Sequence, residues 1–322
     1  MTFELSSTLM IILLCWIILT ISDLAVCGLL KLIIGIQFKK AFLWGLLALL
    51  LPPVIIAYGS LIERNCFRIK EITIHAANLP EAFEGYRIVH ISDIHARSFS
   101  GREKHLQRAI DKINSLDPDI IAFTGDLITM TPDELESHAP ALSSLKAKDG
   151  TFSVLGNHDY SMYSDATEEA RQRHLETLIG KEKALGWDLL MDENRIIRKG
   201  GDSIAVIGVQ NTSPSRHFPS KGDLTKASEG TEDMYRILLT HDPMHWEAEI
   251  IGKDYPLTLS GHTHAMQFSF LGWSPSSLMF KQFRGLYTEN GQSLHVNPGL
   301  GETIFPARIG VRPEITLITL RR

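Results

Sequence analysis

Cysteine is nearly absent from this 322-residue chain. Its three cysteines, Cys15, Cys27 and Cys66, all lie in the first 66 residues, so residues 67–322 contain none. This absence excludes a disulfide framework and a cysteine-based zinc site from the main part of the chain. A strongly basic region is also missing, since the formal net charge is −5. We therefore expect no nucleic-acid partner.

Charged residues are scarce in the first 64 residues. An apolar run extends from Ser7 to Ser22 and resumes after Asp23, and a second, uncharged run covers Ala41–Ile62. The second run is about long enough to cross a bilayer. A cleaved signal peptide would need basic residues ahead of the first run, and the tail MTFELSS has none. We predict that residues 1–64 form a membrane anchor with two retained transmembrane helices.

Two polar or helix-breaking features interrupt these runs. Pro52-Pro53 should kink or break the second helix. Asp23 stands where the first run is interrupted, so we expect it at the membrane interface.

The lysines between the two spans indicate an orientation. The connector contains Lys31, Lys39 and Lys40, whereas the tail before Ser7 has no Lys or Arg. The positive-inside rule places such a connector in the cytoplasm, which puts residues 65–322 on the extracytoplasmic side of an inner membrane. Basic residues soon after the second span favour the opposite orientation; these are Arg64, Arg68 and Lys70.

Residues 65–322 are expected to form one α/β domain. Apolar runs predict strands over Tyr86–Ser92, Asp119–Thr124 and Thr151–Leu155, and helical spacing predicts Glu103–Leu116 and Pro132–Leu145 between them. Later strands are predicted over Ser203–Val209, Arg236–Thr240, Pro256–Ser260, Ser293–Val296 and Glu314–Leu320. These are more closely spaced, which favours a partly antiparallel or mixed sheet. The polar stretch Asn211–Asp233 is predicted to be a long surface loop or lid.

Five of these strands are followed by residues suited to metal ligation. The fragments read, in order, D-I-H, G-D, G-N-H-D, H-D and G-H-T-H, and their candidate residues are Asp93, His95, Asp126, Asn157, His158, Asp159, His241, His262 and His264. Ligands gather beyond the carboxyl ends of strands in open α/β sheets, so these groups should converge. Each fragment alone is typical of a turn or a capped strand end. All five in one chain favour a metal site.

The ordered set of fragments resembles the calcineurin-like metallophosphoesterase superfamily, over roughly residues 71–322. The chain is most similar to the bacterial membrane-associated phosphoesterases, a group that includes UDP-diacylglucosamine hydrolases. The resemblance implies a β-sandwich flanked by helices, here an α/β/β/α arrangement after two transmembrane helices. One departure is visible, because Ala265-Met266 stand where those relatives often have two glycines.

The resemblance also implies the roles of the site residues. Asp93, His95 and His264 would hold one divalent metal ion, Asn157, His241 and His262 a second, and Asp126 would bridge them. His158 would face the phosphate as a charged donor or general acid, with Asp159 orienting it. The attacking group would be a metal-bound hydroxide, so no nucleophilic side chain is needed. Mixed imidazole and carboxylate ligation suits Mn²⁺ best, with Fe or Zn²⁺ as alternatives.

The expected function is hydrolysis of a phosphodiester or pyrophosphate bond in a lipid-linked or cell-envelope substrate. A phosphomonoesterase or protein phosphatase is an alternative. The related protein phosphatases, however, carry a Gly-Asp-x-x-Asp-Arg-Gly block and Gly-Asn-His-Glu, where this chain has GDLITM and GNHD. A non-catalytic metal-binding scaffold is a third hypothesis, which loss of a ligand would have favoured.

Overall fold

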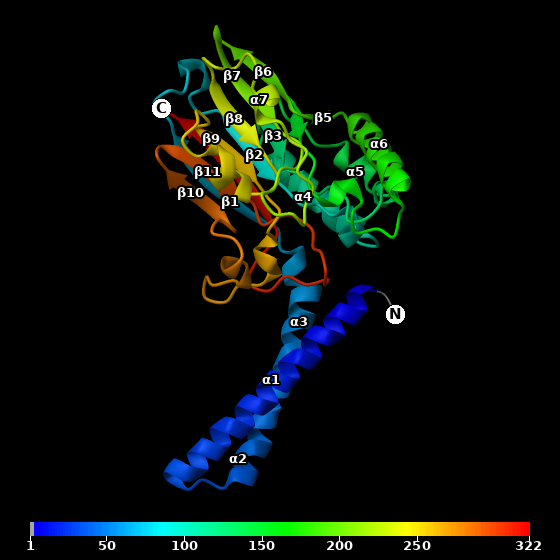
Figure 1. Cartoon of the computed structure of the whole chain (residues 1–322), viewed down its shortest axis with the longest axis vertical. Coiled ribbons are helices and arrows are strands. Elements are labelled where there is room, and N and C mark those ends of the chain that lie inside the picture. Colours follow the sequence, from blue (N-terminus) through cyan, green and yellow to red (C-terminus); the bar gives the residue numbers. More distant parts are fainter. Residues whose placement is uncertain (1–2) are drawn as a thin grey trace.

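The computed structural model describes residues 3–322 and begins with a long helical hairpin (Figure 1). Helix α1 spans Phe3–Ile34, and the chain returns through α2 (Phe38–Gly45), the 3₁₀ turn η1 (Leu46–Leu50) and α3 (Leu51–Leu61). Two stretches of this hairpin are apolar and long enough to cross a membrane, Leu5–Ile34 and Phe38–Asn65.

The second arm of the hairpin is interrupted at the prolines, as predicted, where the 3₁₀ turn η1 gives way to α3. Pro52 and Pro53 occupy the first turn of α3, directly after the 3₁₀ turn, where a missing N–H costs least. Asp23 lies within a helix and not at its end. Helix α1 continues through Asp23 to Ile34, and its carboxylate packs against Gly45 of α2, leaving no room for a Cβ there.

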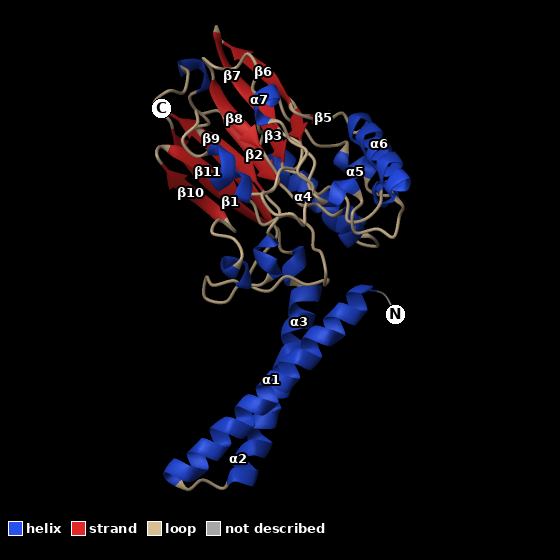
Figure 2. Cartoon of the chain, in the orientation of Figure 1, coloured by secondary structure: helices blue, strands red, loops and turns tan. Residues whose placement is uncertain are grey.

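The remaining chain forms two six-stranded sheets that face each other (Figure 2). The first sheet has the order β1-β12-β2-β3-β4-β5, and the second β10-β11-β9-β8-β7-β6. Both sheets are mixed, because β12–β2, β6–β7 and β10–β11 are antiparallel and the other pairs are parallel.

The strands are β1 (Arg68–His75), β2 (Arg87–Ile91), β3 (Ile120–Phe123), β4 (Thr151–Ser153), β5 (Asp188–Leu189), β6 (Glu193–Lys199), β7 (Asp202–Gly208), β8 (Tyr235–Leu239), β9 (Leu257–Ser260), β10 (Gly285–Glu289), β11 (Gln292–Val296) and β12 (Glu314–Arg321). The flanking α-helices are α4 (Glu103–Ser115), α5 (Ala139–Leu142), α6 (Glu168–Ala184) and α7 (Leu224–Ala227). Short helical turns are η2 (Glu63–Asn65), η3 (Glu81–Phe83), η4 (Ala96–Phe99), η5 (Pro132–Leu135), η6 (His158–Tyr160), η7 (Trp246–Ile250), η8 (His264–Gln267) and η9 (Pro275–Leu278).

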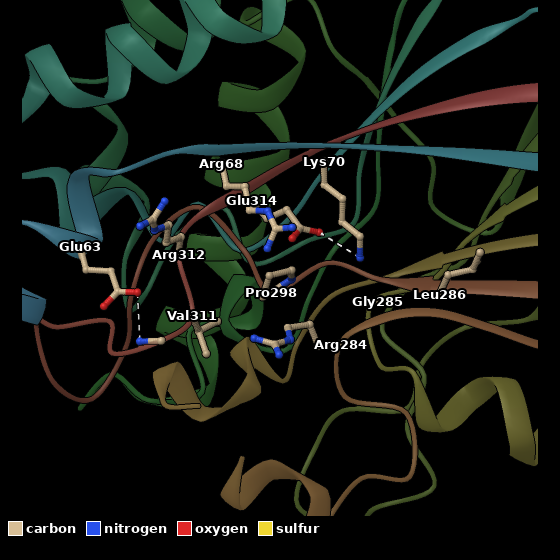
Figure 3. A pocket seen from close by; sticks show the side chains of 11 residues that line it. Glu63, Arg68, Lys70, Arg284, Gly285, Leu286, Pro298, Val311, Arg312 and Glu314 are labelled. Carbon is tan, nitrogen blue, oxygen red and sulfur yellow. Dashed lines mark hydrogen bonds and ion pairs between the residues drawn. The ribbon is translucent and has the colours of Figure 1, made fainter. Parts of the chain in front are cut away.

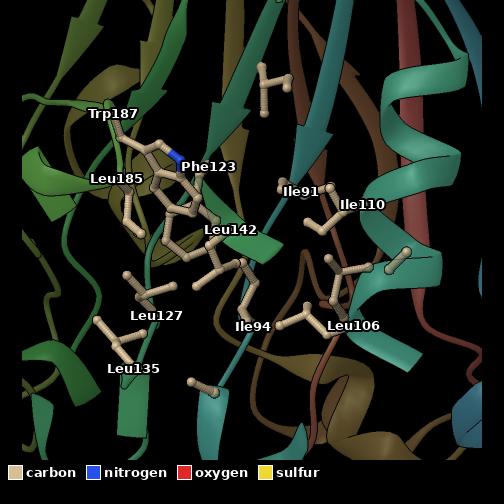
Figure 4. Packing of buried hydrophobic residues seen from close by; sticks show 14 of the residues in the cluster. Ile91, Ile94, Leu106, Ile110, Phe123, Leu127, Leu135, Leu142, Leu185 and Trp187 are labelled. Atoms are coloured by element: carbon tan, nitrogen blue, oxygen red, sulfur yellow. The ribbon is translucent and has the colours of Figure 1, made fainter. Parts of the chain in front are cut away.

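Three apolar layers hold the sheets and helices together. The middle layer lies between the two sheets and includes Ile88, Val206 and Ile237. One outer layer packs α4, α5 and α6 on the first sheet, and Leu106 and Ile110 of α4 lie in it in one buried cluster with the strand residue Ile91 (Figure 4). The other outer layer packs α7 and η7 on the second sheet. This is the expected α/β/β/α sandwich, so the fold class is confirmed.

The long polar loop and the predicted helix over 132–145 differ in detail from expectation. The loop Asn211–Asp233 contains the short helix α7. The predicted helix is two short pieces, η5 and α5, because Pro140 cannot continue a helix from the residues before it.

Candidate metal centre

The ends of five strands bring all nine predicted site residues to one edge of the sandwich. Asp93 and His95 follow β2, Asp126 follows β3, and Asn157, His158 and Asp159 follow β4. From the second sheet, His241 follows β8, and His262 and His264 follow β9. Seven of the nine are buried, and the other two, His158 and His262, are half-buried.

One group of potential ligands consists of Asp93, His95 and His264. The Nε2 atoms of His95 and His264 lie 3.0 Å apart, and His264 Nε2 lies 3.2 Å from Asp93 Oδ1. All three side chains are buried. Two imidazole nitrogens and a carboxylate oxygen thus face one another, which favours a cation between them.

A second group gathers on the other side of Asp126. The Oδ2 atom of Asp126 lies 3.2 Å from His241 Nε2 and 3.5 Å from His95 Nε2 of the first group. The Asn157 Oδ1 atom lies 2.8 Å from His262 Nδ1 and 3.2 Å from His241 Nε2. Asp126 therefore stands between the two groups, within reach of both.

The protonation states of the carboxylates suit metal binding. Burial acts to raise the pKa of Asp93, but the nearby His264 outweighs it and the pKa is lowered. The pKa of Asp126 is also lowered, because His241 and His158 outweigh burial. Both carboxylates are therefore ionised at neutral pH and can serve as ligands.

The histidine side chains of the site differ in their pKa values. Burial lowers the pKa of His95 well below its usual range and also lowers that of His262, so both are neutral. Burial acts in the same direction on His241, but Asp126 raises its pKa to about 10. His241 Nδ1 lies 2.7 Å from the Thr124 carbonyl, which only accepts, so Nδ1 carries a proton and Nε2 faces the site. With that pKa, Nε2 is also protonated at neutral pH, and a divalent cation would bind His241 by displacing this proton.

The backbone at the site is strained in a way that the motif letters do not reveal. Five of the seven candidate ligands have positive φ, namely Asp93 (50°), His95 (44°), Asp126 (60°), His262 (73°) and His264 (49°). Such conformations cost of order 1–3 kcal/mol each and tend to cluster at functional sites. Neighbouring glycines allow the close approach, because a Cβ at Gly156 would meet the Asp126 carboxylate and one at Gly261 would meet that of Asp93.

His158 lies beside both groups and is only half-buried. Its backbone N–H donates to Asp126 Oδ1 at 2.9 Å, and its ring lies edge-on to His95 with centroids 4.8 Å apart. Its Nδ1 donates to the Thr129 carbonyl at 2.8 Å, and Tyr163 stacks on its ring. Nε2 is therefore the ring atom available to a substrate.

Asp159 does not have the orienting role that the sequence led us to expect. Its carboxylate accepts backbone N–H bonds of 2.8–3.2 Å from Asp126, Leu127, Ile128 and Gly156. It is fully buried, and burial with the nearby Asp126 raises its pKa to about 7. Asp159 thus positions the loop that carries Asp126, while Thr129 orients His158.

Sequence reasoning missed three residues that support the site. Thr124 and Thr129 act through backbone carbonyls, which no sequence pattern reveals. Arg308 is fully buried, lies with Nη2 3.3 Å from His264 Nδ1 and donates to the carbonyls of Pro298 and Gly301. An arginine in an otherwise ordinary loop sequence gave no signal of this contact.

These features define a chain with a two-sheet sandwich and a convergent His/Asp/Asn centre, and comparison with known proteins agrees. The family model for calcineurin-like phosphoesterases matches residues 86–266. This is more than half of the chain, which therefore belongs to the calcineurin-like phosphoesterase family. The family consists of metal-dependent phosphoric ester hydrolases, so this chain is an enzyme of that class.

Individual relatives extend the similarity into the amino-terminal region. A "Transmembrane protein with metallophosphoesterase domain" from Danio rerio is 33% identical over 88% of this chain. The chain spans only 64% of that protein's length. The "Uncharacterized metallophosphoesterase YkuE" of Bacillus subtilis is 30% identical over 88% of this chain and 97% of its own. A "UDP-2,3-diacylglucosamine pyrophosphatase" from Chlamydia trachomatis is 27% identical, over 80% of this chain and 91% of its own.

Proposed function

We propose that this protein is a membrane-anchored phosphoesterase with two divalent cations, which hydrolyses a phosphodiester or pyrophosphate bond in a lipid-linked or cell-envelope substrate. The observation that carries the proposal is the position of Asp126, whose carboxylate lies between two groups of potential ligands. In this proposal residues 1–64 are the anchor and residues 65–322 the catalytic domain.

The two groups would each hold one cation. Asp93, His95 and His264 would hold the first, Asn157, His241 and His262 the second, and Asp126 would bridge them. Imidazole with carboxylate and amide oxygens suits Mn²⁺, and also Fe or Zn²⁺. When bound, two such cations neutralise charge on the phosphoryl oxygens and supply a hydroxide at neutral pH.

The protein's own groups would complete the reaction. His158 Nε2 is the ring nitrogen left for a substrate, since Nδ1 is engaged by the Thr129 carbonyl. Protonated at Nε2, His158 would donate to a phosphoryl oxygen or to the leaving oxygen. Asp159 would hold Asp126 and Gly156 in place through its four N–H bonds.

A lipid-linked substrate is supported by two independent features. The hairpin holds the site close to a bilayer, and the Chlamydia relative is named for a substrate with acyl chains. A bond of the pyrophosphate or diester type also agrees with that name.

The test is a substrate panel with the full chain in nanodiscs and added Mn²⁺. The panel contains a bis-aryl phosphodiester, an aryl monophosphate, a nucleotide-sugar lipid with acyl chains, and a phosphopeptide. We expect hydrolysis of the diester and faster turnover of the lipid, with little release from the monophosphate or peptide. A clear preference for the phosphopeptide would overturn the proposal in favour of a protein phosphatase.

A further inference from the structure

The sandwich exposes large apolar side chains on one small part of its surface. Within residues 65–322, eight such side chains are at least two-fifths exposed. Two of them, Tyr163 and Leu286, are not part of the patch described next. Six belong to one patch, which we call the apolar loop surface; it consists of Phe270 (66% exposed), Leu271 (92%), Trp273 (51%), Leu278 (79%), Met279 (66%) and Ile304 (62%). A contiguous patch of this kind marks a protein or membrane contact.

This surface is tied to the end of the helical hairpin. Ser7 Oγ, near the start of α1, donates to the Ile304 carbonyl at 2.6 Å. At the end of α3, Arg64 pairs with Glu302 at 2.9 Å, and Glu63 accepts from Gly310 N at 3.0 Å. Residues 302–310 therefore rest on the ends of both membrane-crossing arms.

The 268–280 segment is joined to that same stretch. Gln267 Nε2 donates to the carbonyls of Phe305 and Ala307, and Ser269 N donates to the Ile309 carbonyl at 2.8 Å. Figure 1 shows the segment beside the upper end of α3. The apolar loop surface thus lies level with the ends of the hairpin, where a bilayer crossed by the hairpin has its interface. A tryptophan and long apolar chains suit that depth.

A cavity lined by basic side chains lies next to this surface. Its volume is about 560 Å³, and one of its lining residues is Glu63, which lies two residues after the end of α3. Arg68, Lys70, Arg284 and Arg312 line it (Figure 3). Among the described residues the only ion pair of these four is Lys70 with Glu314, at 4.0 Å. With Glu63 and Glu314 counted, the lining keeps two positive charges in excess, which suits a phosphate-bearing headgroup.

We propose that the apolar loop surface enters the interface of the bilayer and that the basic cavity holds the headgroup of an anionic phospholipid from the same interface. The domain then makes a second membrane contact beyond its helices. The loop starts directly after His262 and His264, and Thr263 Oγ1 donates to the Phe283 carbonyl at its other end. The contact therefore holds the candidate metal centre at the membrane surface.

The depth of the loop is tested with a fluorescent label. The full chain, with its three cysteines changed to serine, carries Leu271→Cys labelled with bimane and is reconstituted into phosphatidylcholine–phosphatidylglycerol nanodiscs. We expect lipids with a doxyl quencher on the acyl chain to quench this label by at least half. Glu229→Cys, an exposed position next to α7, is the matched control and should stay unquenched. Equal quenching at the two positions would overturn the contact.

The cavity is tested by the lipids that remain bound. After gentle extraction from the same nanodiscs, native mass spectrometry should find phosphatidylglycerol retained by the wild type in preference to phosphatidylcholine. Arg284→Ala with Arg312→Ala should lower this retention several-fold. Arg173→Ala with Lys183→Ala, a pair of exposed basic residues on α6, should leave it unchanged.

A separate arm adds inorganic phosphate to the extracted protein. If phosphate forms an adduct that Arg284→Ala with Arg312→Ala abolishes, and no lipid is retained, the cavity is a free-phosphate site and the lipid proposal fails. Retention that does not depend on the cavity arginines would also contradict it. Neither measurement requires turnover, so each outcome is independent of the substrate proposed above.

Discussion

Asp126 is the residue on which both halves of the candidate centre depend. Its carboxylate lies within 3.5 Å of an imidazole nitrogen from each group. We predict that Asp126→Asn abolishes turnover and lowers bound metal toward one ion per chain or none, because the shared negative charge is lost. Elemental analysis of the purified chain and hydrolysis of a bis-aryl phosphodiester measure both effects.

The matched control is Asp165→Asn, an exposed aspartate that lies outside the candidate ligand groups. It should keep wild-type metal content and rate. Normal metal content and activity in Asp126→Asn would show that the two-cation assignment is wrong.

His158 should affect the rate without holding metal. Its Nδ1 is engaged by the Thr129 carbonyl, which leaves only Nε2 for a substrate. We predict that His158→Ala keeps both metal ions but lowers kcat by roughly two to four orders of magnitude, the usual scale for a general acid. His75→Ala, at an exposed position on β1, is the control. If metal is lost together with activity, His158 is a ligand.

Glu182 should give the fold a pH dependence unrelated to metal. It is fully buried on α6 and accepts from Ser153 Oγ at 2.7 Å. Burial, with the nearby Asp159, raises its pKa to about 8 from an ordinary value of about 4.5. A raised folded-state pKa means that the stabilisation is complete below about pH 4.5 and is lost as the pH rises towards 8.

We therefore predict that Glu182→Gln, which cannot ionise, gains stability relative to the wild type as the pH rises from 5 to 8. The expected gain is on the order of a few kcal/mol. Thermal unfolding of both proteins in detergent at pH 5, 6.5 and 8 measures it. A difference in Tm that does not change with pH would show that Glu182 is not protonated in the folded state.

At the scale of elements, the turn after β9 is built from residues that rarely adopt its conformation. Ala265, Met266 and Gln267 follow His264 with φ of 47°, 48° and 55°. The turn keeps its shape because it is bonded on both sides, with Ser274 Oγ donating to the Ala265 carbonyl and Gln267 bonded to residues 303–307. These bonds hold the turn, and with it the candidate ligand His264, in place.

Met266 offers a test of this strain. A β-branched residue is disfavoured at positive φ far more than glycine is. We predict that Met266→Val lowers the free energy of unfolding by about 1–2 kcal/mol relative to Met266→Gly. Thermal unfolding in detergent compares the two. A valine variant at least as stable as the glycine variant would contradict the left-handed conformation at this position.

Sequence reasoning was most successful for elements whose own residues carry the signal. The buried strands β2, β3, β8 and β9 are short apolar runs, each followed by candidate ligands, so both the strand and the candidate residues could be predicted from the local sequence. Helix α6 was missed because only Leu175, Leu178 and Glu182 of its seventeen residues are buried, which leaves little apolar periodicity. The strands β1, β6 and β10 were missed as well; each lies at the edge of a sheet and is largely exposed.

Sequence patterns could not predict contacts between segments that are distant in the chain. The four N–H bonds to Asp159 depend on how the loops after β3 and β4 meet, so spacing alone suggested the wrong partner for its carboxylate. The packing of Asp23 on Gly45 likewise depends on the register of two helices. The residues of the centre were predictable, whereas the groups that position them were not.

For the whole molecule, the question is which side of the membrane the domain faces. Lys31, Lys39 and Lys40 lie at the turn of the hairpin, at the end remote from the sandwich (Figure 1). The start of α1 and the sandwich lie together at the other end, and the tail before Ser7 has no Lys or Arg. Three basic residues follow the second span at the sandwich end and act against the orientation that the lysines of the turn favour, namely Arg64, Arg68 and Lys70.

We predict that the lysine-rich turn is cytoplasmic and the domain extracytoplasmic, because three lysines lie at the turn and none precedes the first span, and the positive-inside rule counts Lys and Arg close to the ends of the spans. Alkaline phosphatase, which is active only after export, should be active when fused at residue 322 and inactive when fused after Ile36 in the turn. A reporter that is active only in the cytoplasm should give the reverse pattern at the same two positions. An inactive phosphatase at residue 322, together with an active cytoplasmic reporter there, would place the metal centre inside the cell and exclude periplasmic envelope substrates.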